Sequence, residues 1–277
     1  MHRSDVLITG AGPTGLVLAL WLSKLGVRVR IIDKTSAPGT TSRALAVQAR
    51  TLELYRQLDL SDTIVRNGHR VAAANFWVSG KPVAKLPLNR IGEGLTPYAF
   101  VEIFPQDQHE KLLIERLEDY GVTVERNTTL ESFTENGDGL TAHLRLPDGE
   151  QEICQACYLA GCDGARSVVR KALDAGFPGG TYQQIFYVAD VQASGPAMNG
   201  ELHIDLDEAD FLAVFPLAGE GRARLIGTVR DERAQRAETL EFSDVSSRAI
   251  EHLNVHVEDV HWFSTYRVHH RVAEHFR

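Results

Sequence analysis

The feature that most constrains the fold of this sequence is a glycine-rich turn close to its N-terminus. Gly10-Ala11-Gly12-Pro13-Thr14-Gly15 has the spacing GxGxxG and lies between an apolar run at residues 6–9 and a helical pattern over 16–25. A second run rich in β-branched residues follows at 27–32. Strand, glycine turn, helix and strand within about 30 residues predict a right-handed βαβ unit that binds a dinucleotide.

Each residue of this turn has a predicted task. Gly10 makes the tight turn, Gly12 lets backbone amides approach a pyrophosphate, and Gly15 lets the helix pack closely on the strand. Ala11, Pro13 and Thr14 complete the loop, and the start of the helix offers unpaired N–H groups and its positive dipole end to the phosphates. We therefore expect the phosphate site at residues 10–15.

An acidic residue, Asp33, ends the second predicted strand and is followed by Lys34. A carboxylate about 20 residues beyond the glycine turn accepts hydrogen bonds from ribose hydroxyls and disfavours a 2′-phosphate. The tightly bound nucleotide is therefore expected to be FAD or NAD and not NADP. The alternative is a tight strand–helix turn followed by a surface carboxylate.

The remainder of the chain alternates between α/β segments and sheet segments. Helices are predicted over 48–58, 107–120 and 245–253, and a hairpin signal lies at 136–139. Strands are predicted over 71–78, 83–88, 99–104, 122–125, 158–162, 183–191, 201–206, 211–216, 224–229 and 260–269. This pattern predicts an α/β fold in which a Rossmann-like domain, discontinuous in sequence (1–70 and 98–180), is combined with an inserted, mostly antiparallel β-sheet domain (71–97 and 181–277).

Composition narrows the classes of partner. The formal net charge is −8, from 29 basic and 37 acidic residues, which gives no electrostatic reason to bind nucleic acid or an anionic membrane. The most apolar run, residues 16–22, is shorter than the ~20 residues of a membrane span. No secretory signal is visible, and three cysteines in 277 residues are typical of a reduced protein, so a cytoplasmic location is expected.

Two other groups of residues have spacings that also occur in metal or redox sites. Cys154, Cys157 and Cys162 give the spacing C-x2-C-x4-C, but no second C-x-x-C accompanies them. His252 and His256 have a helical i,i+4 spacing without an HExxH motif. We expect thiols that are at least half buried, partly solvated imidazoles, and no metal site.

Four segments resemble one known family, the FAD-dependent aromatic hydroxylases, or class A flavoprotein monooxygenases. This family includes para-hydroxybenzoate hydroxylase, phenol hydroxylase and pentachlorophenol monooxygenase. The segments are the glycine turn with Asp33, the turn Thr41-Ser42-Arg43-Ala44, Pro105-Gln106 at the start of a helix, and YLAGCDGARSVVR at 158–170. The last is similar to the family's DG motif, with Asp163 and Gly164 in a turn and Ser167 placed to cap the next helix.

The resemblance implies both a cofactor and a reaction. It implies that Arg43, Ala44 and Gln106 contact FAD, and that Asp163 and Gly164 contact its ribose–pyrophosphate region. It also implies that NADH or NADPH transiently reduces the flavin, and that a C4a-hydroperoxide formed with O2 hydroxylates a phenolic or related aromatic substrate. Phe186, Tyr187, Phe211 and Phe215 are candidates for lining an aromatic pocket, with packing in the core as the alternative. The resemblance identifies no catalytic base, and homo-oligomerisation stays open.

The sequence departs from the family pattern at its C-terminal end. The family's Gly-Asp motif, which holds the ribityl chain, and the segment that closes the flavin site are expected after residues 266–273, but neither occurs before Arg277. The departure leaves three readings: a fragment of a longer protein, a chain that needs a partner, or a truncated, catalytically incomplete FAD-binding module. Another enzyme of the same flavin fold, an epoxidase or a reductase, is a separate alternative. Trp21, Trp77 and Trp262 do not form the W-x-W-x-I-P segment of flavin halogenases.

Overall fold

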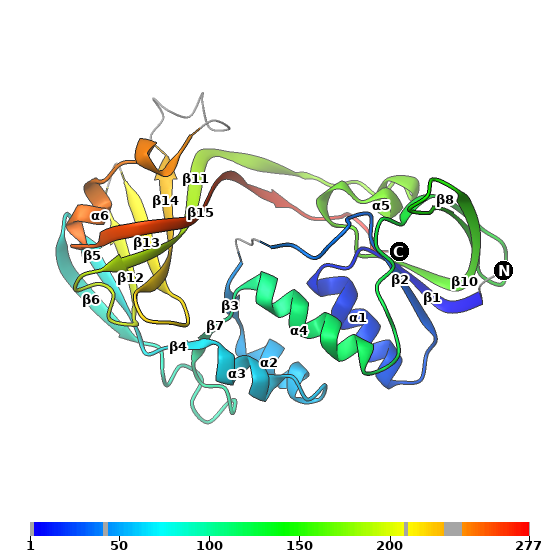
Figure 1. Ribbon diagram of the computed structural model, residues 1–277, viewed down its shortest axis with the longest axis horizontal. Coiled ribbons are helices and arrows are strands. Elements are labelled where there is room, and N and C mark those ends of the chain that lie inside the picture. The colour runs from blue at the N-terminus through cyan, green and yellow to red at the C-terminus, as the bar shows by residue number, and fades with distance from the viewer. Residues whose placement is uncertain (1–2, 41–43, 208–209, 230–239, 277) are drawn as a thin grey trace. The chain divides into compact units, whose positions relative to one another are not determined.

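The computed structural model describes residues 3–40, 44–207, 210–229 and 240–276. It contains two compact units, each assembled from separate stretches of chain (Figure 1). The first unit comprises Met1–Ser42, Gln106–Pro178 and Arg271–Arg277, and the second comprises Arg43–Pro105 and Gly179–His270.

The first unit contains the predicted βαβ arrangement. Within its described residues, a five-stranded sheet has the order β2-β1-β10-β9-β8, and β1 runs parallel to both β2 and β10. The strands are β1 (Arg3–Thr9), β2 (Val29–Ile32), β8 (Thr129–Glu135), β9 (Leu140–Arg145) and β10 (Gln151–Gly161). The helices are α1 (Pro13–Lys24), α4 (Gln106–Glu118) and α5 (Val168–Ala172), with a 3-10 turn at Gly164–Arg166.

Strand β10 has an antiparallel neighbour on one side and a parallel neighbour on the other. Its first half, from Gln151 to Ala156, pairs antiparallel with β9, and its second half runs parallel to β1 as far as Gly161. On the side away from β1, no strand among the described residues pairs with residues 157–161. That open edge borders a groove of about 1350 Å³ formed with the β8–β9 hairpin, α5 and residues 271–276.

The second unit is mostly antiparallel sheet. Its described residues form a seven-stranded sheet of order β15-β11-β14-β13-β12-β5-β6, in which β12 and β5 are parallel, and a small sheet of order β3-β7-β4. The large sheet contains β5 (Ala73–Val78), β6 (Lys81–Pro87), β11 (Gly179–Ser194), β12 (Leu202–Leu206), β13 (Phe211–Pro216), β14 (Arg222–Val229) and β15 (His256–Arg271). The small sheet contains β3 (Ala46–Val47), β4 (His69–Val71) and β7 (Val101–Ile103), and the helices are α2 (Ala49–Arg56), α3 (Ser61–Asn67) and α6 (Arg248–His252), with a 3-10 turn at Phe242–Asp244.

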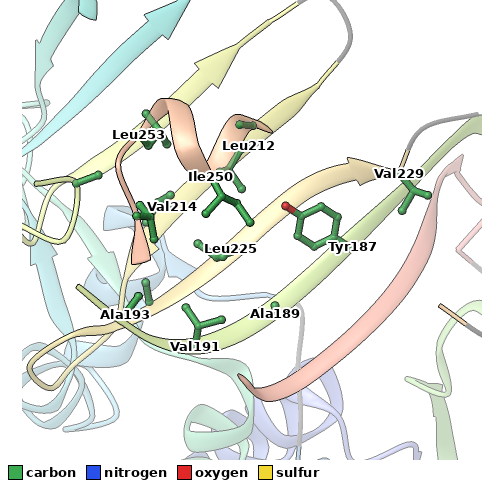
Figure 2. Close-up of a cluster of buried hydrophobic side chains, with 14 of the residues drawn as sticks. Tyr187, Ala189, Val191, Ala193, Leu212, Val214, Leu225, Val229, Ile250 and Leu253 are labelled. Atoms are coloured by element: carbon green, nitrogen blue, oxygen red, sulfur yellow. The ribbon is translucent and has the colours of Figure 1, made fainter. Parts of the chain in front are cut away.

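The two faces of the large sheet differ in character. One face carries a buried apolar cluster drawn from β11, β13, β14 and α6, which Figure 2 shows around Tyr187, Leu225 and Ile250. On the other face Arg224 is 1% exposed, and its guanidinium donates to both carboxylate oxygens of Asp190 at 2.6 and 2.8 Å. A third donor of Arg224 reaches the carbonyl oxygen of Ala44 at 3.5 Å.

The units divide the chain at other positions than the predicted domain boundaries. Residues 43–70 and 98–105 fall in the second unit, and 271–277 fall in the first. The physical reason is a shared apolar cluster: Leu45, Val71 and Ile103, next to or within the small sheet, pack with Leu217 and Phe215 of the large-sheet region. The roles of the two domains in binding cofactor and substrate stay a prediction.

Several predicted elements have different bounds in the structure. Residues 122–125 form only an isolated bridge, Ile32 to Glu125, and no strand. The predicted strand at 158–162 is the end of the longer β10, because 151–156 find a partner in β9. Helix α3 was not predicted from the sequence, since it is short and half polar. Among the helices of the described residues, none has both the length and the apolar character needed to cross a bilayer.

Candidate functional site

The glycine turn joins β1 to α1 and has the predicted local geometry. Gly10 has φ +100°, and a Cβ at that position would collide with the carbonyl group of Cys162. A Cβ on Gly15 would collide with the carbonyl oxygen of Gly10. Both glycines therefore permit close packing of backbone on backbone, which is the role predicted for Gly15.

Gly12 differs from these two glycines because its Cα faces open space. A Cβ added there would meet no protein atom within 4 Å. Gly12 is also the N-cap of α1, which starts with Pro13, has no side-chain cap and has no acidic residue in its first turn. The N-terminal N–H groups of α1 thus lie uncapped beside open space, an arrangement that suits an anion.

Asp33 lies directly beside the glycine turn. Its Oδ2 accepts a hydrogen bond from the backbone N–H of Ala11 at 2.6 Å, and its Oδ1 accepts from the N–H and hydroxyl of Thr35 at 2.8 and 2.6 Å. Burial raises the pKa of Asp33, but these hydrogen bonds and the charge of Arg126, 3.9 Å away, outweigh it and hold the pKa below the ordinary value. The side chain is thus a fixed anion.

The Asp163-Gly164 turn lies against the glycine turn, because the carbonyl group of Cys162 is next to Gly10 and its N–H donates to Thr9 at 2.8 Å. The Asp163 Oδ2 atom accepts from the N–H of Val168 at 2.6 Å. Its Oδ1 atom is buried and has no hydrogen-bond partner among the described residues. A buried carboxylate oxygen without a donor is costly, so the site fits a donor supplied by a ligand.

Two predictions for this turn are confirmed. Gly164 has φ +74°, a conformation that favours glycine. Ser167 caps α5, since its hydroxyl accepts from the N–H of Arg170 at 3.0 Å.

The other predicted site residues lie at different places. Lys34 is exposed, and Gln106 begins α4 and donates to Oε1 of Glu110 at 2.8 Å. Ala44 is exposed and belongs to the second unit, while Arg43 lies outside the described residues. The structure thus brings together residues 10–15, Asp33 and the Asp163 turn. Contacts of Lys34, Gln106, Arg43 and Ala44 with a nucleotide stay predictions.

The candidate aromatic residues divide between the two faces of the large sheet. Tyr187 is buried in the apolar cluster of Figure 2, with its ring stacked on Phe263. Phe215 packs against the second cluster, around Leu45 and Ile103. Phe186 is partly buried and contacts the rings of Phe211 and Tyr266. Core packing therefore explains Tyr187 and Phe215, whereas Phe186 and Phe211 keep partly exposed rings.

The cysteines are free thiols in the structure. Cys154 is buried, while Cys157 and Cys162 are partly exposed. Burial, together with the neighbouring charge of Asp163, raises the pKa of the Cys162 thiol and keeps it protonated. Of the two histidines singled out in the sequence, His252 donates from its ring Nδ1–H to Oδ2 of Asp205 at 3.0 Å.

Sequence reasoning missed what fixes the Asp33 carboxylate. Thr35 lies two residues after Asp33, and an Asp that bonds the N–H two residues on is a recognised turn signal that was available in the sequence. Arg126 approaches from residues far along the chain, and no local pattern indicates that approach.

Together, the glycine turn, the bare helix N-terminus, the fixed anion at the end of β2 and the orphaned oxygen of Asp163 define a dinucleotide-binding fold. A family model described as "FAD binding domain" matches residues 3–277. The chain therefore belongs to the FAD binding domain family, and FAD is its cofactor. The open space at Gly12 and the unpartnered Asp163 Oδ1 fit that cofactor.

Similar proteins are monooxygenases. The chain is 36% identical over 224 residues to a 6-methylpretetramide 4-monooxygenase of Streptomyces rimosus, covering 81% of this chain and 40% of that protein. A p-nitrophenol 4-monooxygenase, PnpA, from Pseudomonas putida DLL-E4 has the same fold, with TM-score 0.83, 23% identity and coverage of 100% and 71%. Aklavinone-11 hydroxylase, solved with FAD and aklavinone, gives TM-score 0.79, 25% identity and coverage of 100% and 56%. The chain thus spans about two fifths of the length of the first relative.

Proposed function

We propose that this chain functions as a FAD-dependent monooxygenase that hydroxylates an aromatic substrate, with NADH or NADPH as reductant and O2 as oxidant. The observation that carries the proposal is the N-terminus of α1. Its N–H groups have no side-chain cap, and the N-cap residue, Gly12, borders open space. The monooxygenase relatives give the reaction class.

The residues of the first unit have distinct tasks in this proposal. The backbone N–H groups at the start of α1 hold the FAD diphosphate, and the bare Gly12 lets it approach. Asp33 keeps the turn in shape through Ala11 and accepts from an adenosine ribose hydroxyl through a remaining lone pair. Asp163 accepts a second ligand hydroxyl at its unpartnered Oδ1.

Three further positions complete the proposed site by resemblance. The resemblance to the aromatic hydroxylases supports FAD contacts for Arg43 and Ala44, which precede β3 in the sequence, and for the amide of Gln106, the first residue of α4. Gln106 already donates to Glu110, which leaves its carbonyl oxygen and a second amide hydrogen for a ligand.

Bound FAD would supply the redox chemistry: NAD(P)H provides two electrons, one oxygen atom of O2 is added to the ring, and the other leaves as water. The protein's contribution is to bind and orient this cofactor and to exclude water from the reacting atoms. The substrate class we propose is a phenolic ring, alone or in a fused aromatic system. This choice of substrate class is supported by the compounds that appear in the names of the similar proteins, namely 6-methylpretetramide, p-nitrophenol and aklavinone.

The test uses the purified 277-residue chain. Visible absorbance measures FAD binding, and NAD(P)H oxidation is then followed with and without a panel of phenols that includes p-nitrophenol. Bound flavin with phenol-stimulated oxidation and a hydroxylated product supports the proposal. A yellow protein without phenol stimulation is a reductase, and a colourless, inactive protein is an incomplete module; either result contradicts the proposal for this chain.

A further inference from the structure

A fully buried carboxyl group lies at the centre of the small sheet in the second unit. Glu102 is on the middle strand, β7, opposite Val47 of β3 and Arg70 of β4. Its exposed fraction is 0%, and neither carboxyl oxygen has a hydrogen-bond partner among the described residues. A buried charge in this position would be uncompensated, so the surroundings favour the neutral acid.

The carboxyl group is tightly confined. Its Oε1 atom packs against Gly68, where a Cβ would collide with that oxygen and approach the carbonyl oxygens of Ile103 and Ile64. Gly68 has an ordinary, negative φ, so close approach and not backbone conformation explains why glycine fits there. The carboxyl group therefore has little room to turn toward solvent.

The neighbouring cation has another partner. Arg70 is exposed, and its guanidinium carbon lies 4.4 Å from the centroid of the Phe100 ring. Residues directly opposite on antiparallel strands have Cβ atoms about 5 Å apart, so Arg70 is within reach of Glu102 without any movement of the backbone. Arg70 thus has two alternative sites, the aromatic ring and the carboxyl group.

The groups facing Glu102 from each packed element are few. The opposing residue on β3 is the apolar Val47, and Ile64 of α3 approaches beyond Gly68 with its backbone. Burial raises the pKa of Glu102 and the positive charge of Arg70 lowers it by less, so that the pKa lies at about 7. The neutral and ionised forms are therefore both populated near neutral pH.

We propose that Glu102 and Arg70 form a proton-operated switch in the small sheet. While Glu102 holds its proton, Arg70 lies on the Phe100 ring. When the carboxyl proton leaves to solvent, Arg70 moves from the ring to the carboxylate and forms an ion pair. The segment before β7, where Phe100 contacts the ring of Tyr98 edge-on, then loses its cation–π contact.

The test is an infrared titration of the apoprotein between about pH 5 and 9, which follows the C=O stretch of a protonated carboxyl group. Glu102→Gln assigns the band by removing it. We expect the parent band to titrate near neutrality, far above an ordinary glutamic acid. A protein without a protonated-carboxyl band at about pH 5.5 would overturn the proposal.

Three variants separate a switch from a carboxyl group that is merely buried. Arg70→Gln should raise the titration midpoint, because the cation that stabilises the carboxylate is gone. Phe100→Leu should lower it, because Arg70 loses its alternative site. Arg66→Gln in the last turn of α3 is the matched control and should leave the midpoint unchanged.

An unmoved midpoint in both Arg70→Gln and Phe100→Leu would show that Arg70 does not exchange partners. If Arg70→Gln does not fold, Arg70→Lys replaces it and should shift the midpoint by less than Phe100→Leu does.

Discussion

Gly12 and Gly15 belong to the same glycine motif, but a side chain would meet different surroundings at the two positions. A side chain at Gly12 enters open space, whereas a side chain at Gly15 collides with the backbone of Gly10. We predict that Gly12→Val folds normally but binds FAD at least about tenfold more weakly, a loss of about 1.4 kcal/mol. Flavin fluorescence titration measures the affinity, and circular dichroism measures the melting temperature.

Gly15→Val is the matched comparison, and it should lower the melting temperature of the apoprotein itself. Wild-type FAD affinity in Gly12→Val would contradict the phosphate site at the start of α1. Equal melting losses in both variants would contradict the distinction between an open and a packed glycine.

Asp33 is expected to make stability depend on pH. Its pKa lies below the ordinary 3.8, so its stabilisation is present above that value and is lost as pH falls through the lower folded-state pKa. Asp33→Asn removes the charge and one acceptor, and should cost about 1–2 kcal/mol at neutral pH. Urea unfolding of the apoprotein at several pH values should show this difference shrinking below pH 3.8.

Glu150→Gln, which neutralises an exposed carboxyl group, serves as the control for Asp33. A difference between Asp33→Asn and the parent that stays constant down to strongly acidic pH would mean that the Asp33 charge contributes nothing to stability.

Strands β11 and β14 are joined by a buried ion pair as well as by their ladder. Because Arg224 is almost fully buried, removal of Asp190 leaves a buried charge without a counter-ion. We predict that Asp190→Ala destabilises the protein by about 3–5 kcal/mol, whereas the double variant Arg224→Met/Asp190→Leu recovers most of that loss. Denaturant unfolding of the single and double variants measures the coupling.

A double variant as unstable as Asp190→Ala would show that the apolar replacements do not fit, and Arg224→Met alone then separates packing from charge. Additive losses in the two single variants would contradict the ion pair as the cause.

Elements with strong local signals could be predicted from the sequence. The unit β1–α1–β2, the hairpin of β5 and β6, and helix α4 all follow from apolar periodicity and glycine stops, and they lie within a few residues of their predicted positions. The geometry of the glycine turn was also predictable, because the GxGxxG spacing itself specifies the tight turn and the close helix–strand packing.

Features that depend on distant partners could not be predicted in this way. Residues 151–156 carry no strong strand signal of their own and form a strand because β9 pairs with them. Strand β3 has only two residues, which form a strand because β7 lies beside them. The same holds for the candidate site. The contact of Cys162 with Gly10 and the approach of Arg126 to Asp33 join residues far apart in sequence, which no local pattern indicates.

At the scale of the whole molecule, the exposed edge of β10 is a surface through which copies of the chain can associate. In the described part of the chain, residues 157–161 have one unpaired strand edge, which borders a largely apolar groove, and Tyr158 in that edge is 71% exposed. Unpaired edges beside apolar surface promote association, and lysine on an edge opposes it. We predict that the 277-residue chain self-associates with rising concentration and that Tyr158→Lys reduces this, as measured by sedimentation velocity.

Leu95→Lys is the matched control, because Leu95 is a large apolar side chain that is 88% exposed but lies in a loop of the second unit. A parent chain that stays monomeric at all accessible concentrations, or an equal effect of both lysines, would contradict the role of the β10 edge.

The pairing of β1 with β10 has a consequence for the order of events during synthesis. Residues 3–9 leave the ribosome well before their partner strand at residues 155–161. At about 5–20 residues per second, β1 therefore waits many seconds before it can pair with β10. During that interval Leu7 and Ile8, both fully buried in the finished protein, have no neighbour on the β10 side and are natural targets for a chaperone.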